Sequence, residues 1–358
     1  GGNIKGSTRI LDDSGNFTVK LNKALAPGSD KLVFPALYSQ KQGGQDRILL
    51  AVLQPTSGGA PKKNLKLDIW MWTATLNSGS AGTLTIKESS GSAAVLVFLL
   101  NLAAMAEAAD AAGAAQIKPL AVLWAPNITW TCGACFASAA PQQTASGTQL
   151  SQSIFISDDQ GGAGAWGYPV LMHEFGHYVA NNYSRDDSPG GSHYIGQLIP
   201  PAFAWSEGWA SFFSLAIMST WVEEAISIFW DIQSGSSFWI DIDSAETSKG
   251  FLKKPTASGG MAQSLDEYYV SAMIWHLWDG KEIPETAGDN DGVALGWDSV
   301  LRSIMSKRFL SWDRGGKGSD FVDFVDATLC SQGSLKSQVT KTITTYLGFP
   351  YDGKPGCP

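Results

Sequence analysis

The stretch VLMHEFGHYVANN, residues 170–182, most constrains what this chain can fold into. It places His173, Glu174 and His177 among apolar residues, and Pro169 just before it suits the first turn of a helix. Residues three and four apart lie on one face of a helix, so the two imidazoles and the carboxylate point the same way. Two neutral histidines at this spacing can bind Zn²⁺, with the glutamate beside an open coordination position. The alternative is a buried helix whose histidines make ordinary hydrogen bonds.

A helical glycine and a second apolar segment extend this prediction. Gly176 costs about 1 kcal/mol relative to alanine inside a helix, which indicates that another group approaches it closely. The segment AFAWSEGWASFF carries Glu207 as a lone carboxylate in apolar sequence. An unpaired charge buried there would cost several kcal/mol, and a metal ion removes that cost. We therefore predict Glu207 as the third ligand, with His193 as the competing candidate. A Glu207 that faces solvent, or lies near the positive end of its helix, is the alternative.

The order of predicted elements indicates an α+β protein. Residues 1–90 contain short alternating apolar runs between turn residues, which is typical of strands in a small sandwich or barrel. The pattern then changes to a helix at 92–113, buried strands at 118–126 and 152–158, and further helices. We expect three parts: a β-rich N-terminal domain at 1–90, a central subdomain with the two motif segments at 91–220, and a mainly helical C-terminal subdomain at 221–358.

Charge and hydropathy restrict the partners. The formal net charge is −8 and no cluster of Lys and Arg is present, so we expect no nucleic-acid partner. The longest apolar run, residues 93–105, contains Asn101 and is shorter than the roughly 20 residues of a membrane span. We therefore expect a buried helix there and no membrane span. Only 16% of the residues are charged, and surfaces poor in charge are common among exported proteins, so we expect a secreted, extracellular protein.

The four cysteines predict two disulfides. Local pairing is favoured, with Cys132 bonded to Cys135 and Cys330 bonded to Cys357. A rival interpretation takes WTCGAC, after a buried strand, as similar to a thioredoxin active site, which would make Cys132 and Cys135 the centre of a thiol–disulfide oxidoreductase. That chemistry needs the first cysteine at a helix N-terminus, and the sequence that follows is too rich in Pro, Gly and Ser for a long helix.

HEFGH followed by SEGWASFF resembles the gluzincin metallopeptidases, which share an HExxH helix and a second helix that bears a glutamate. EGW resembles the fungalysin family, and EGWASFF also resembles the NEGFA stretch of aminopeptidase-N-like enzymes. The similarity covers about residues 150–280. It implies a zincin-type catalytic domain with a small mixed sheet, and a zinc peptidase that acts on a peptide or protein substrate. It also implies that residues 152–157 form the sheet-edge strand to which the substrate backbone adds.

The resemblance assigns roles to the motif residues. It implies that His173, His177 and Glu207 bind one Zn²⁺ and that Glu174 is the general base. Fungalysins and thermolysins carry an aspartate four residues after the third ligand, where this chain has Ser211. The interval before Glu207 is also longer than in these families, and the Gly-x-Met-x-Asn segment of aminopeptidase-N-like enzymes is missing. Exopeptidase action is therefore not implied, and a catalytically inactive binding or adhesion protein with the same fold is a second interpretation.

Water attack on a carbonyl creates an oxyanion, which needs a donor beyond the metal. Aminopeptidase-N-like enzymes have a tyrosine at the start of a Y-x-x-G-A helix, and aligning Ser271 with that glycine implies Tyr268. Fungalysins have a histidine at the equivalent place, which makes His276 a candidate. Tyr269 shares a helix face with His276, and Tyr194 is a weaker rival. The alternative for the three residues of this helix is packing with a satisfied polar tip.

The stretch GDNDG, residues 288–292, raises the question of Ca²⁺. Where an EF-hand loop after Asp289 would need its bidentate carboxylate, this chain has Val300. A turn is therefore the better interpretation, and Ca²⁺ is only a weakly supported cofactor beside Zn²⁺.

Overall fold

The computed structural model describes most of the chain, which forms two compact units. The described residues are 6–9, 18–21, 31–42, 45–75, 86–87, 91–112, 117–158, 163–233, 236–244, 252–280 and 292–357. One unit comprises residues 1–35 and 70–92, and the other comprises residues 36–69 and 93–358. The segment predicted as one N-terminal domain, residues 1–90, is thus divided between the two units.

The smaller unit contains two antiparallel strand pairs. β1 (Gly6–Arg9) pairs with β2 (Thr18–Leu21), and β3 (Lys31–Pro35) pairs with β7 (Met71–Thr75). This unit keeps the β-rich character that the alternating apolar runs predict.

A mixed sheet forms the base of the larger unit, in the order β11-β10-β6-β5-β8-β12-β9, with β4 also paired to β5. Its strands are β4 (Leu37–Gln42), β5 (Gln45–Gln54), β6 (Lys66–Ile69), β8 (Leu120–Leu123), β9 (Ala134–Ala137), β10 (Gln142–Thr144), β11 (Gln149–Leu150) and β12 (Gln152–Ile156). β5, β8 and β12 run parallel to their neighbours in this series and are buried on both faces where they pair, as expected for a sheet covered on both sides. This pairing explains why residues 36–69 belong with the helices rather than with the N-terminal strands.

The edge strand is β9, not β12. The resemblance implied that residues 152–157 lie at the sheet edge, but β12 lies between β8 and β9. Gly133 O accepts a hydrogen bond from Ser157 N at 3.0 Å. Residues of an antiparallel strand alternate in direction, so Ala134 and Phe136 turn their N–H and C=O groups away from β12. The prediction was wrong because residues 134–137 carry no alternating apolar pattern that marks them as a strand.

α1 (Ser92–Ala112) confirms the helix predicted at 92–113. Ala94, Val97, Asn101, Ala104 and Ala108 are buried at helical spacing, whereas other positions are partly exposed. By length and composition alone, this helix could cross a membrane, a test that core helices of soluble proteins also pass.

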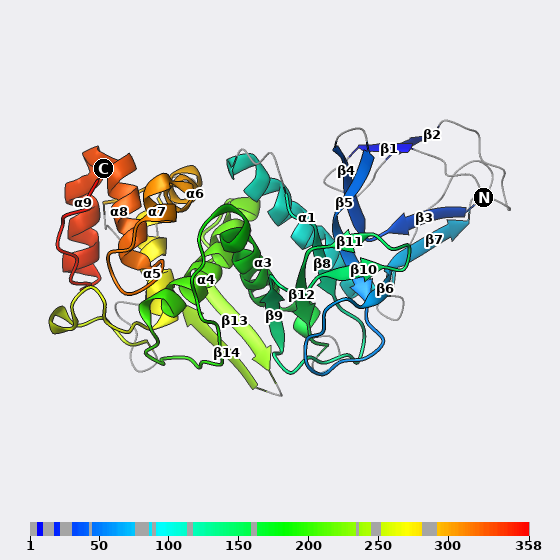
Figure 1. The fold of residues 1–358 in the computed structure, drawn as a ribbon, viewed down its shortest axis with the longest axis horizontal. Helices are drawn as coiled ribbons and strands as arrows, with labels where there is room; N and C mark the ends of the chain where they lie inside the picture. The colour runs from blue at the N-terminus through cyan, green and yellow to red at the C-terminus, as the bar shows by residue number, and fades with distance from the viewer. Residues whose placement is uncertain are drawn as a thin grey trace. The chain divides into compact units, whose positions relative to one another are not determined.

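Three helices build the centre of the larger unit: α3 (Tyr168–Tyr183), α4 (Pro201–Val222) and α5 (Glu267–Trp278). Figure 1 shows α3 against the β12–β9 side of the sheet, with α4 beside it. Two glycines allow the helices to approach. A Cβ on Gly176 would lie 2.8 Å from Ala210 Cα, and a Cβ on Gly208 would lie 2.6 Å from Glu267 O. The close approach that Gly176 predicted is therefore present.

The C-terminal part adds a hairpin and short helices. β13 (Ile228–Gln233) pairs with β14 (Ser236–Asp241), so the segment 221–358 is not purely helical. The apolar residues at 228–230, IFW, follow an apolar helical segment in the sequence. A short apolar run does not by itself distinguish a strand from a helix. The remaining elements are α2 (Ala163–Trp166), η2 (Ala257–Gly259), α6 (Trp297–Met305), α7 (Lys307–Ser311), α8 (Phe321–Ser331), η3 (Gly333–Leu335), α9 (Lys336–Lys341) and η4 (Thr342–Tyr346).

Both predicted disulfides are confirmed. Cys132 is bonded to Cys135 at the start of β9, and Cys330 at the end of α8 is bonded to Cys357. The chain after Cys132 forms a strand rather than a helix, so Cys132 does not lie at a helix N-terminus.

Taken together, the segregated helices and the mixed sheet make the fold α+β.

Candidate metal centre

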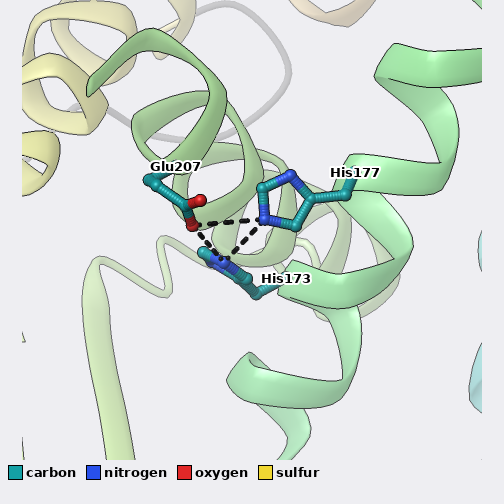
Figure 2. A group of neighbouring side chains, drawn as sticks. All are labelled: His173, His177 and Glu207. Carbon is teal, nitrogen blue, oxygen red and sulfur yellow. Dashed lines mark hydrogen bonds and ion pairs between the residues drawn. The ribbon is translucent and has the colours of Figure 1, made fainter. Parts of the chain in front are cut away.

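Three side chains from α3 and α4 converge on one point (Figure 2). Glu207 Oε2 lies 3.2 Å from Nε2 of His173 and 3.2 Å from Nε2 of His177, and the two nitrogens are 3.1 Å apart. A tetrahedral zinc ion with bonds of about 2.0–2.1 Å places its ligand atoms roughly 3.3 Å apart. The three atoms therefore fit a small tetrahedral ion that has one position left for another group.

The electrostatics of the three residues favour a cation between them. Burial opposes the charged form of His177, but the Glu207 carboxylate offsets this effect and raises the pKa of His177 to about 9. Burial alone would raise the pKa of Glu207, yet the two histidines hold it well below its ordinary value. The side chains are only 11% to 14% exposed. Glu207 is thus a desolvated anion that needs positive charge.

Each histidine has its other ring nitrogen held in place. Nδ1 of His173 lies 3.0 Å from Ser211 Oγ, which can accept its proton when Nε2 is left free for an ion. Nδ1 of His177 faces Ser206 Oγ at 3.3 Å, and Ser206 Oγ donates to Asp186 Oδ2 at 3.1 Å. Ser211, four residues after Glu207, therefore places a hydroxyl beside the first histidine, and Asp186 reaches the second histidine through a serine.

Glu174 lies on the same face of α3 and is almost fully buried. Burial raises its pKa, against the opposing effect of His173 and His177. The backbone N–H of Phe136 in β9 hydrogen-bonds to its carboxylate, which lowers the pKa. A buried carboxylate of raised pKa has the proton affinity that a general base needs. The contact with Phe136 also brings the sheet edge to this residue.

Tyr268 lies on α5 near Glu207. Its pKa is raised well above the ordinary value by burial, with the nearby carboxylates of Glu267, Asp231 and Glu207 adding to the effect. Its ring packs 5.5 Å from that of Phe229, which in turn lies 5.9 Å from the ring of His173. The backbone N–H of Tyr268 donates to Asp266 Oδ1 at 3.0 Å, which fixes the residue in the first turn of α5.

The other predicted donors lie elsewhere. Tyr269 donates its hydroxyl proton to Leu347 O at 2.9 Å, and the His276 ring packs edge-on against Tyr346, so both belong to the core. Tyr194 is 71% exposed on the loop before α4. The predicted packing role thus describes Tyr269 and His276, and the structure brings only Tyr268 to the site. Asp289 of the calcium candidate lies outside the described residues.

His193 lies beside the group of His173, His177 and Glu207 rather than within it. Its Nε2 is 3.9 Å from Glu207 Oε2 and 2.8 Å from Glu267 Oε2. The ion pair with Glu267 raises the pKa of His193 to about 9, against the effect of burial. Its side chain is 25% exposed, which makes it the most accessible of these residues.

The sequence patterns did not predict that Asp186, Ser206 and Glu267 contact the candidate site. Asp186 and Ser206 act through contacts between a loop and a helix, for which no local pattern exists. Glu267 stands in the first turn of α5, where an acid ordinarily indicates only a favourable interaction with the helix dipole. The signal available was its place next to Tyr268 in an otherwise apolar helix.

A scan against protein-family models found no match, and a search of curated proteins found no sequence that matches the chain.

Proposed function

We propose that this protein is a secreted zinc-dependent peptidase of the gluzincin type, with His173, His177 and Glu207 as ligands and Glu174 as general base. The observation that carries the proposal is the spacing of the three ligand atoms, 3.1 to 3.2 Å, beside a buried carboxylate of raised pKa. On this proposal, residues 91–220 hold the ligands and the base of a zincin-type domain. The two disulfides are compatible with export.

The roles of the residues follow from their positions. A bound Zn²⁺ would polarise a scissile carbonyl and lower the pKa of a water molecule to about 7. Glu174 takes the proton from the attacking water and delivers it to the leaving amine. Tyr268 donates its O–H to the oxyanion that forms on the carbonyl. Ser211 and Ser206 keep the two imidazoles in the tautomer that leaves Nε2 free for the ion.

The substrate is an extended peptide that pairs with the edge of β9. Ala134 and Phe136 turn their backbone groups away from β12, and Phe136 N–H already reaches Glu174. A peptide added along this edge passes directly beside the general base. Backbone pairing is independent of side chains, so this edge favours cleavage within a chain over recognition of a free terminus.

Glu174→Gln tests the mechanism, with the exposed residue Glu224 changed to Gln as the matched control. We expect Glu174→Gln to bind one zinc ion per chain and to lose about 10²- to 10⁴-fold in kcat on casein or a quenched peptide library, because the amide cannot accept the proton. Glu224→Gln should keep both properties. Cleavage by Glu174→Gln at the wild-type rate would refute the mechanism. Zinc binding without any cleavage by the wild-type protein would instead support an inactive binding protein.

A further inference from the structure

A second group of metal-ligating atoms lies next to the first. His193 Nε2, Glu267 Oε2 and the Glu207 carboxylate lie within 4.8 Å of one another. Glu207 belongs to both groups, since its Oε2 atom is 3.2 Å from His173 and 3.9 Å from His193. His193 and Glu267 take no part in the mechanism proposed above.

His193 is arranged like a metal-binding histidine. Its Nδ1 lies 3.2 Å from Gly191 O, and a carbonyl oxygen only accepts, so Nδ1 carries the proton of this contact. A ligating histidine usually donates one ring N–H to a carbonyl or carboxylate and directs the other nitrogen at the ion. Gly191 has a φ of +135°, which a side chain would strain, so a glycine is required to present that carbonyl.

Glu267 is buried, and its charged partner among the described residues is a histidine. Its side chain is 7% exposed, and its Oε2 atom lies 2.8 Å from Nε2 of His193. The ion pairs that described residues make to Glu207 and Glu267 all come from histidines. Two buried carboxylates without Lys or Arg partners are a costly arrangement that a divalent cation relieves.

We propose that His193, Glu267 and the shared carboxylate of Glu207 form a second site for a divalent metal ion. One nitrogen and two carboxylate donors suit Zn²⁺ or another borderline transition metal. The second group is less evenly spaced than the first, with contacts of 2.8 and 3.9 Å against 3.1 to 3.2 Å, so we expect it to bind its ion more weakly and after the first. The proposal rests on the proposed function only through Glu207, which would bind both ions. A carboxylate can bridge two ions in this way because it has two oxygens.

The test counts metal ions rather than turnover. Metal-free protein is titrated with Zn²⁺ by calorimetry, and bound zinc is measured by elemental analysis after dialysis at stepwise free concentrations. We expect a tight ion followed by a weaker one in the wild-type protein. His193→Gln and Glu267→Gln should keep the tight ion and weaken the second by more than about tenfold, since each loses a ligand. The control Glu224→Gln should bind both ions normally.

The outcomes separate this proposal from the proposed function. A wild-type protein that binds one ion at every concentration overturns the second site and leaves the first intact. A second ion that His193→Gln and Glu267→Gln bind as tightly as the wild type lies elsewhere, which also overturns the proposal. A protein that binds no zinc refutes both sites. If one variant fails to fold, which circular dichroism reveals, the other decides.

Discussion

Replacing Gly176 by alanine tests whether the contact between α3 and α4 sets the geometry of the metal centre. Gly176 lies between His173 and His177 on α3 and faces Ala210 on α4, one turn after Glu207. A Cβ at this position would lie 2.8 Å from Ala210 Cα and 3.2 Å from Phe213 Cβ. The nearest obstacle is backbone, so side-chain rotation cannot relieve the contact.

The magnitude follows from these distances. Carbon atoms in contact lie about 3.5–4.0 Å apart, so α4 must move away by roughly 0.7–1.2 Å. Metal–ligand distances tolerate about 0.2 Å, so Glu207 can no longer meet both histidines at their present spacing. We expect zinc affinity to fall about 10- to 100-fold, which is about 1.4–2.7 kcal/mol. Overpacking costs about 1–3 kcal/mol and the better helix former returns about 1 kcal/mol, so the metal-free protein loses roughly 0–2 kcal/mol of unfolding free energy.

The assay is competition for zinc against a chromophoric chelator, together with denaturant unfolding of the metal-free protein. Gly333→Ala is the matched control, because a Cβ there meets no atom within 4 Å. It should leave affinity unchanged and alter stability by less than about 0.5 kcal/mol. If Gly176→Ala binds zinc within about twofold of the wild type, the contact does not set the spacing of the ligands and the reasoning is refuted.

Three further predictions concern the groups around the ion. Ser211→Ala removes the acceptor of His173 Nδ1 and should weaken zinc binding about 10- to 100-fold in the same competition assay; an unchanged affinity would show that this hydrogen bond does not orient the ring. Tyr268→Phe should keep zinc and KM but lower kcat about 10²- to 10³-fold, and an unaltered kcat would assign the oxyanion donor to another group. Because Glu207 raises the pKa of His177 to about 9 in the metal-free protein, its charged form adds stability below pH 6.5 that is lost as the pH rises through 9. Zinc binding at pH 7.5 should accordingly release about one proton, seen as a dependence of the binding enthalpy on the buffer; no such dependence would contradict the shift.

The local parts of the centre could be predicted from the sequence. The apolar periodicity around His173 and Glu207 specifies two helices, and the spacing of the histidines specifies which face they share. Gly176 indicated a close approach because a helix tolerates glycine only at a cost. Each of these predictions rests on residues within one or two turns of each other.

The parts of the centre that depend on contacts between distant residues could not be predicted from the sequence. Residues 134–137 become the sheet edge only because they pair with β12, and nothing in their own composition predicts that partner. The apolar run of β5 is compatible with any sheet, so the local sequence does not predict that β5 pairs in parallel with β8. It therefore does not predict that residues 36–69 belong to the larger unit. The link from Asp186 through Ser206 to His177 likewise joins a loop to two helices.

The position of the ligands along the chain has a consequence for how the protein matures. His173, His177 and Glu207 come from two consecutive helices, whereas Tyr268 and Glu267 belong to α5, which follows them after the hairpin. Contacts between neighbouring segments form faster than distant ones, because less chain entropy is lost in closing a short loop. During synthesis the pair α3–α4 leaves the ribosome before α5 does. If the proposed function holds, the chain would bind its ion before α5 supplies Tyr268, so metal loading would precede peptide hydrolysis during synthesis.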